Sequence, residues 1–235
     1  MALPLPPLNS DIPYIDLHTH QVGNKDSQVW QVVNLMAGEQ PPDGARFLSL
    51  GIHPWQLLHE KDTVFEYRFI RQLNLQGLVA IGEAGLDRAI GLPLYEQIPV
   101  FVMQARLAAA LGLPLIIHAV RTIPELIELR KKIRDAGPWI IHGFNGQPEA
   151  ARQLLQHGFY LSFGEALLQN NSKAAAAIRE VPSDRLFLET DEAGILIPEI
   201  YSVAATLLDM HPDSLKSTIM ANFRKLFQKV FFDHG

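Results

Sequence analysis

The chain contains no cysteine among its 235 residues. Disulfides, iron–sulfur clusters and thiolate zinc sites are therefore excluded, and any metal site must use nitrogen and oxygen ligands. The chain also lacks a run of about 18 uncharged apolar residues, so a membrane span is not expected. Its first residues, MALPLPPLNS, have neither a basic start nor a continuous apolar stretch, which argues against a secretory signal. From these absences we expect a cytoplasmic protein.

An excess of positive charge is absent as well. The formal net charge is −5, which argues against a basic nucleic-acid-binding surface over the whole protein but not against a local anion site made by metal ions. With 48% hydrophobic and 19% charged residues, the chain has the composition of one that buries a sizeable core. We expect a monomer with a single domain over 1–235, in which 1–12 form an extended lead-in and 212–230 a C-terminal helix.

Short apolar runs alternate with segments of helical pattern after residue 12. The runs lack polar alternation, as expected for strands that are covered on both faces. The expected strands are 13–17, 30–35, 46–51, 78–82, 114–117, 139–141, 159–163 and 186–189. The expected helices are 62–75, 94–111, 123–135, 147–157, 171–180, 197–208 and 212–230. Asp62 is expected to cap the first helix, Gly112 to end the second, and Asp213 or Ser214 to cap the last.

Eight strands with intervening helices predict an α/β fold, an irregular (β/α)8 TIM barrel. The barrel would be irregular because the segment between the second and third strands is too short and proline-rich for a helix. The alternative is a doubly wound open sheet, which places its ligand at one switch point between two neighbouring strands. Candidate ligands here follow at least five strands, which favours a closed barrel because all its carboxyl strand ends surround one axis.

Histidines follow three of the apolar runs. His18 and His20 are two residues apart, so on a strand they point to the same face and can reach one cation. His118 and His142 follow the runs LII and WII. Each of these histidines alone could be a core residue bonded to a backbone carbonyl, but their shared position at strand ends indicates a common site.

Carboxylates follow two further apolar runs. Glu83 comes after VAIG, where an unpaired charge is costly to bury; it could pair with Arg88 or Arg121, or bind two metal ions. Asp191 ends the segment LFLETD, where it could cap a helix. Together, four histidines, one glutamate and one aspartate suit two divalent cations about 3.5–4 Å apart. Ligation by nitrogen and oxygen suits zinc, manganese, iron, nickel or magnesium.

Seven short motifs follow one another in order from about residue 13 to 228. They are Ile15-Asp16-Leu17-His18-Thr19-His20, Gly51-Ile52-His53-Pro54, Gly82-Glu83-Ala84-Gly85-Leu86-Asp87, the stretch from Pro114 to His118, the stretch from His142 to Gly146, Leu188-Glu189-Thr190-Asp191, and Asn222-Phe223-Arg224-Lys225-Leu226-Phe227. In this order they resemble the TatD-family metal-dependent hydrolases, which belong to the amidohydrolase-like barrels.

The resemblance implies hydrolysis of phosphoester bonds, including deoxyribonuclease activity, on DNA or a small phosphorylated compound. It implies one metal held by His18, His20 and Asp191, a second metal held by His118 and His142, and Glu83 as a bridge between them. Asp191 and Glu83 are the expected catalytic residues, with Asp191 accepting the proton of a metal-activated water.

Three residues are expected to contact the substrate: His53, Asn145 and Arg121. His53 either donates a hydrogen bond to the phosphoryl oxygens or packs beside the site. Arg121 lies one position later than the arginine in the family's usual H-x-R pattern, which could direct its side chain onto Glu125. The displaced Arg121 and the acidic Glu192 keep an alternative open, hydrolysis of a C–O or C–N bond in a lactone, ester or amide. A non-catalytic metal-binding protein would lack a ligand, and none is missing.

Overall fold

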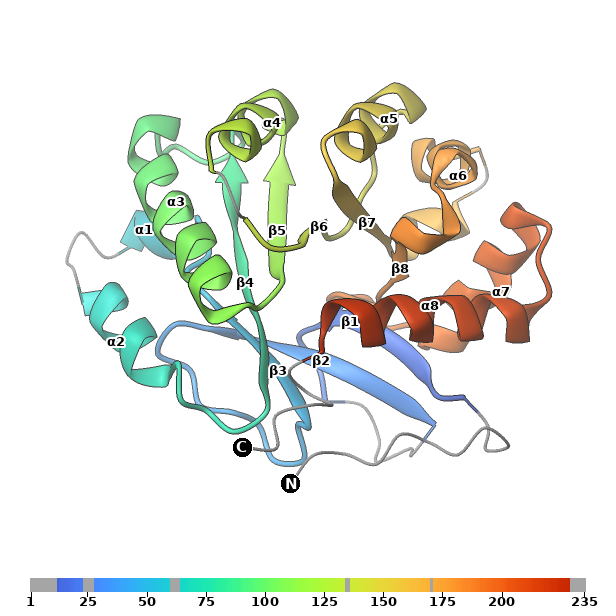
Figure 1. Cartoon of the computed structure of the whole chain (residues 1–235), viewed down its shortest axis with the longest axis horizontal. Helices are drawn as coiled ribbons and strands as arrows, with labels where there is room; N and C mark the ends of the chain where they lie inside the picture. The colour runs from blue at the N-terminus through green and yellow to red at the C-terminus, as the bar shows by residue number, and fades with distance from the viewer. Residues whose placement is uncertain (1–11, 23–27, 60–63, 134–135, 170, 229–235) are drawn as a thin grey trace.

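The computed structural model describes residues 12–22, 28–59, 64–133, 136–169 and 171–228. Eight strands form one sheet in which each pairs in parallel with its neighbours, in the order β1 to β8 (Figure 1). They are β1 (Tyr14–Thr19), β2 (Val29–Met36), β3 (Phe47–Gly51), β4 (Leu78–Asp87), β5 (Leu115–Val120), β6 (Trp139–Ile141), β7 (Phe159–Phe163) and β8 (Leu186–Leu188). Spatial order that follows chain order without a switch point rules out the doubly wound alternative.

The first and last strands meet at the carboxyl end of the sheet. Thr19 forms a parallel bridge with Asp191. The backbone N–H of Asp191 donates to the carbonyl of His18 at 2.9 Å, and that of His20 donates to the carbonyl of Asp191 at 3.3 Å. This contact joins the two edges and confirms the predicted (β/α)8 barrel.

Helices cover the outside of the strands (Figure 1). They are α1 (Gln56–His59), α2 (Val64–Gln72), α3 (Leu94–Leu111), α4 (Ile123–Lys132), α5 (Pro148–Gln156), α6 (Lys173–Ala177), α7 (Ile197–Leu208) and α8 (Pro212–Leu226), with short 3-10 turns η1 (Glu165–Leu168), η2 (Ile178–Glu180) and η3 (Ser183–Arg185). All eight strands fall on predicted runs, and no helix lies between β2 and β3. No helix within the described ranges is long and apolar enough to cross a membrane.

Helix boundaries show where the sequence pattern succeeded and failed. Gly112 ends α3 in the left-handed region at φ 62°, as predicted. The prediction of Asp213 or Ser214 as the cap of α8 is wrong: Pro212 opens the helix and the Nδ1 atom of His211 accepts a hydrogen bond from the N–H of Asp213. The predicted cap Asp62 lies outside the described residues. The single turn α1 was not predicted.

Aromatic side chains fill the layer between strands and helices. Trp139 on β6 lies edge-on to Phe101 of α3, with ring centroids 5.3 Å apart. Phe223 and Phe227 of the C-terminal segment stack on each other at 4.3 Å and are almost fully buried. Their burial stabilises the packing of α8 against the barrel, and this helix contacts β1 and β8. The apolar side chains of the sheet are therefore buried.

Candidate metal centre

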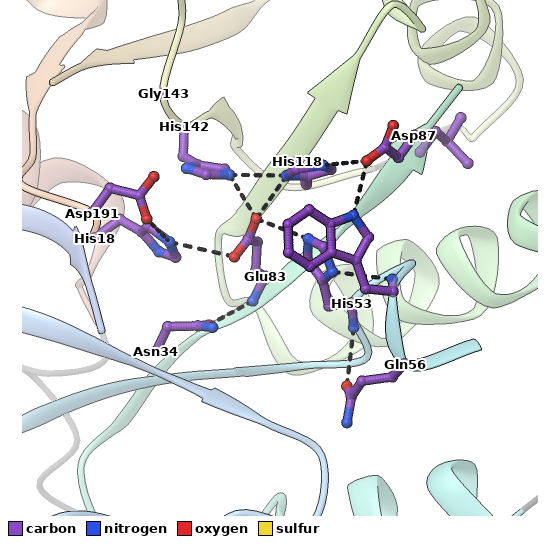
Figure 2. Close-up of polar contacts among 12 residues, drawn as sticks. His18, Asn34, His53, Gln56, Glu83, Asp87, His118, His142, Gly143 and Asp191 are labelled. Atoms are coloured by element: carbon purple, nitrogen blue, oxygen red, sulfur yellow. Dashed lines mark hydrogen bonds and ion pairs between the residues drawn. The ribbon is translucent and has the colours of Figure 1, made fainter. Parts of the chain in front are cut away.

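All six predicted metal ligands meet at the carboxyl end of the barrel. Five of them, which Figure 2 labels, point toward one another from different strands. Their origins are β1 for His18, the residue after β1 for His20, β4 for Glu83, β5 for His118, the residue after β6 for His142, and the segment after β8 for Asp191. Because parallel strands in a barrel end around one axis, ligands far apart in the sequence are brought to one point.

Glu83 lies at the centre of this cluster. Its Oε1 atom is 2.9 Å from Nδ1 of His118 and 2.7 Å from Nε2 of His142. Its Oε2 atom is 3.5 Å from Nε2 of His18 and 3.6 Å from Nε2 of His20. The two oxygens of one carboxylate therefore face two different pairs of histidines, so the alternative of an ion pair with an arginine is wrong.

Asp191 completes the first of these two groups. Its Oδ1 atom is 3.5 Å from Nε2 of His18 and 3.6 Å from Nε2 of His20. His18 is fully buried, and neither of its ring nitrogens has a hydrogen-bond partner among the described residues. Burying a polar atom without a partner is unfavourable by about 1–3 kcal/mol. A divalent cation at this position would satisfy the ring nitrogen that faces the two carboxylates, so the residues present fit a metal.

The charges of the cluster depend strongly on one another. Burial alone would raise the pKa of Glu83, but the positive charge of His142 and hydrogen bonds from His118 and His142 hold it well below the usual value. Burial lowers the pKa of His142, and the charge of Glu83 outweighs this and raises it well above the usual value. Burial and the charge of His142 lower the pKa of His18, while its contacts with the carboxylates of Asp191 and Glu83 raise it to about 9. The metal-free cluster therefore holds protons that a metal must displace, which makes metal affinity depend on pH.

His53 lies beside Glu83 on the side of the second group. Its Nε2 atom is 3.2 Å from Oε1 of Glu83, and its Nδ1 atom accepts a hydrogen bond from the backbone N–H of Trp55 at 3.1 Å. Because Nδ1 is an acceptor, Nε2 carries the proton in the neutral ring. Burial lowers the pKa of His53 and favours this neutral form.

Two further carboxylates lie next to the outer ring nitrogens of His118 and His142, the nitrogens that do not face Glu83. The sequence analysis assigned neither of them. Oδ2 of Asp87 is 3.2 Å from Nε2 of His118. Oε1 of the buried Glu189 is 3.4 Å from Nδ1 of His142 and accepts the N–H of Gly143 at 2.5 Å. Carboxylates that bond the outer nitrogen of a ligating histidine fix its tautomer and orientation. Both carboxylates lie inside the matched motifs, within four residues of a predicted ligand.

The three predicted substrate contacts differ in exposure, since His53 is buried whereas Arg121 and Asn145 are exposed. Arg121 is exposed and adopts a left-handed conformation at φ 56°. The predicted partner Glu125 accepts a hydrogen bond from Arg88 instead, at 2.5 Å, so the redirection of Arg121 onto Glu125 is wrong. Asn145 and Glu192 are exposed close to His142 and Asp191 in the chain.

Close backbone approach at the site requires glycine at two positions. A Cβ atom on Gly85 of β4 would collide with the carbonyl oxygen of His118 on β5. A Cβ atom on Gly51 of β3 would collide with the carbonyl of Glu83. Glycine therefore lets β3, β4 and β5 carry their polar side chains close together.

Comparisons with known proteins agree with this geometry. The model of the family described as TatD related DNase matches residues 39–228. The 3′-5′ ssDNA/RNA exonuclease TatD of Cronobacter sakazakii is 30% identical over 206 residues, which are 77% of this chain and 76% of that protein. The uncharacterized metal-dependent hydrolase YabD of Bacillus subtilis is 34% identical over 149 residues, 62% of this chain and 58% of the relative. The crystal structure of YjjV, a TatD homologue from Escherichia coli K12, shares the fold, with a TM-score of 0.77, 24% identity and coverage of 93% of this chain and 99% of the other. The matched model and the aligned relatives show that this chain belongs to the family of TatD-related DNases.

Proposed function

We propose that this protein is a metal-dependent hydrolase that cleaves phosphodiester bonds in nucleic acid. The observation that carries the proposal is the position of Glu83, whose two carboxylate oxygens face separate histidine pairs. Two divalent ions that share a carboxylate are a recurrent device for in-line displacement at phosphorus. A relative named as a single-stranded nucleic-acid exonuclease supports the same reaction class.

The proposed metal complement is two divalent cations. His18, His20 and Asp191 would hold one, His118 and His142 would hold the other, and Glu83 would contact both. The nitrogen and oxygen donors suit zinc, manganese, magnesium, nickel or iron. When bound, such cations polarise phosphoryl oxygens and lower the pKa of a water molecule toward neutrality.

The side chains of the chain position the substrate and move the proton. Burial would raise the pKa of Asp191, but the contact with His18 and the charge of His142 lower it, so this carboxylate is ionised at neutral pH. We assign it the role of accepting the proton from the attacking water. Asp87 and Glu189 keep His118 and His142 in place, and His53 presents its Nε2 to the same site. Arg121 and Asn145 remain our proposed contacts to the substrate.

The test is an assay on a single-stranded oligonucleotide and on a general phosphodiester. Asp191→Asn should abolish metal-dependent cleavage of both, since an amide cannot accept the proton. Asp209→Asn is the matched control, because Asp209 shares the left-handed backbone, with φ of 53° against 54° for Asp191, but is exposed at the end of α7. We expect the control to retain wild-type activity. Elemental analysis should find two divalent ions per chain in the wild type.

The same assay distinguishes the proposed reaction at phosphorus from the alternative reaction at a carbonyl carbon. A panel of lactones, esters and amides is tested with the metal-loaded protein beside the phosphodiesters. Turnover of a carbonyl substrate that Asp191→Asn abolishes, together with no cleavage of any phosphodiester, contradicts the proposed function.

A further inference from the structure

Trp55 is a half-exposed tryptophan at the edge of the metal centre. The chain has three tryptophans; Trp30 and Trp139 are 7% and 1% exposed, whereas Trp55 is 51% exposed. Single exposed aromatic side chains are common on protein surfaces, but this indole is open directly beside the polar residues of the metal centre, where an aromatic ring can contact a bound molecule. Trp55 therefore calls for an explanation that core packing does not provide.

The indole is fixed in place although it is open to solvent. Its Nε1–H donates to Oδ2 of Asp87 at 2.9 Å, the same oxygen that lies 3.2 Å from Nε2 of His118. The ring stands edge-on to His53, at 5.1 Å between centroids and 89° between planes. It is 6.3 Å from the ring of His118 at 75°. The indole is thus held rigidly against two histidines that face Glu83, and about half of its surface remains open.

A hollow lined by two arginines lies where β4 and β5 end, because Arg88 directly follows β4 and Arg121 directly follows β5. It has a volume of about 430 Å³ and is lined by Arg88, Arg121 and five residues of the 90–94 segment. Arg88 is held by its bond to Glu125, while Arg121 directly follows β5 and is exposed. Two guanidinium groups line the hollow, and arginine is well suited to bind phosphate.

We propose that Trp55 is a stacking platform for the base next to the scissile phosphate, and that the arginine hollow receives the neighbouring phosphate. This inference rests on the proposed nuclease function and adds to it a contact that recognises a base of the substrate. A small phosphate ester has no base to stack and no second phosphate. In a duplex the face of each base is covered by its neighbours, whereas in a single strand it is free to stack on an aromatic side chain.

The kinetic test compares an oligothymidylate with an abasic oligomer of the same length. Trp55→Ala and Trp55→Phe both lose the hydrogen bond to Asp87, so the difference between them isolates the ring. We expect the KM for the oligothymidylate to be roughly 5- to 150-fold higher in the alanine variant than in the phenylalanine variant. On the abasic oligomer the two variants should have equal KM. Arg121→Gln should raise KM for both substrates, because it removes a phosphate contact.

The control is Tyr67→Ala, which removes an aromatic ring that is 60% exposed on α2. It should behave as the wild type. If Trp55 only holds Asp87 and His118, both Trp55 variants will lose kcat equally on both substrates, and the inference is overturned. It is equally overturned if neither variant differs from the wild type on the oligothymidylate.

A binding measurement separates this inference from the proposed function. Because Trp55 is the exposed tryptophan of the three, its fluorescence should be quenched when the metal-free protein is titrated with oligothymidylate, and much less with the abasic oligomer. If the wild type cleaves no phosphodiester but shows this base-dependent quenching, the nuclease proposal fails and the platform stands. If cleavage occurs without base-dependent quenching, the platform fails and the nuclease stands.

Discussion

The substitution Asp16→Asn should stabilise the metal-free protein at alkaline pH. Asp16 is fully buried on β1. Its Oδ1 atom accepts the N–H of Thr190 at 2.9 Å, and its Oδ2 atom accepts the hydroxyl of Thr190 at 2.7 Å and the amide of Gln31 at 3.3 Å. Burial raises its pKa from 3.8 to about 6, because these hydrogen bonds offset only part of the desolvation.

The sign of the effect follows from proton linkage. The pKa of Asp16 is higher in the folded than in the unfolded protein, so the folded state binds more protons between pH 3.8 and about 6. Stability therefore falls as the pH rises through this window. A shift of about two units corresponds to roughly 3 kcal/mol at pH 8. Asparagine is neutral and similar in shape to aspartate. Its side-chain carbonyl can still accept the backbone N–H of Thr190, and its NH2 group can donate to the hydroxyl of Thr190 and to the amide carbonyl of Gln31, once these two groups have turned.

The assay is urea unfolding of the metal-free wild type and variant at pH 4, 6 and 8. We expect the variant to gain up to about 3 kcal/mol over the wild type at pH 8 and to be close to it at pH 4. Asp43→Asn, at an exposed loop position, should show no such pH-dependent difference. A variant that is less stable than the wild type by the same amount at every pH refutes the reasoning, because Asp16 would then be ionised in the fold without a desolvation cost.

Three further predictions concern the metal centre and its support. Glu189→Gln should weaken metal binding about 10- to 100-fold, because His142 loses the carboxylate that orients it; isothermal titration with a divalent cation measures this, and unchanged affinity would show that Glu189 has no part in metal binding. Gly85→Ala should destabilise the protein by at least about 1–3 kcal/mol, because its Cβ meets the carbonyl of His118; thermal unfolding checks it, and a wild-type melting temperature contradicts the close approach. Removal of metal by a chelator should lower the melting temperature, and restoring free metal at about 100 times Kd should return roughly 2.7 kcal/mol; a temperature that does not respond to metal contradicts a site formed by the folded state.

Much of the fold could be predicted because most strands are short apolar runs without polar alternation. Runs such as Trp139–Ile141 on β6 and Leu186–Leu188 on β8 are buried along their whole length. Such runs need cover on both sides, which only parallel strands with outer helices provide. Once the topology is a barrel, residues such as His118 and His142 that end these runs must share one end of it. The convergence of the proposed ligands could therefore be predicted from the fold class and the motifs.

The supporting contacts depend on geometry that strand patterns carry only in part. Asp87 is four residues after Glu83 on β4, so the period of a strand places both on one face, and this signal was available. His142 follows β6 and Glu189 follows β8. Because β7 lies between these two strands, the pairing of neighbouring strands does not predict this contact. The left-handed backbone conformation of Arg121 could not be predicted from the sequence, because arginine has no preference for it.

The bridge between Thr19 and Asp191 means that the site forms only after the two ends of the barrel have come together. These two residues are 172 positions apart, and contacts between such distant segments form slowly because a long loop must close first. During synthesis the chain emerges from its N-terminus, so His18 and His20 are available long before Asp191. An unfinished chain cannot assemble the full ligand set, whatever metal surrounds it. Binding of a cation by the complete proposed set therefore requires that the first and last strands of the barrel have met.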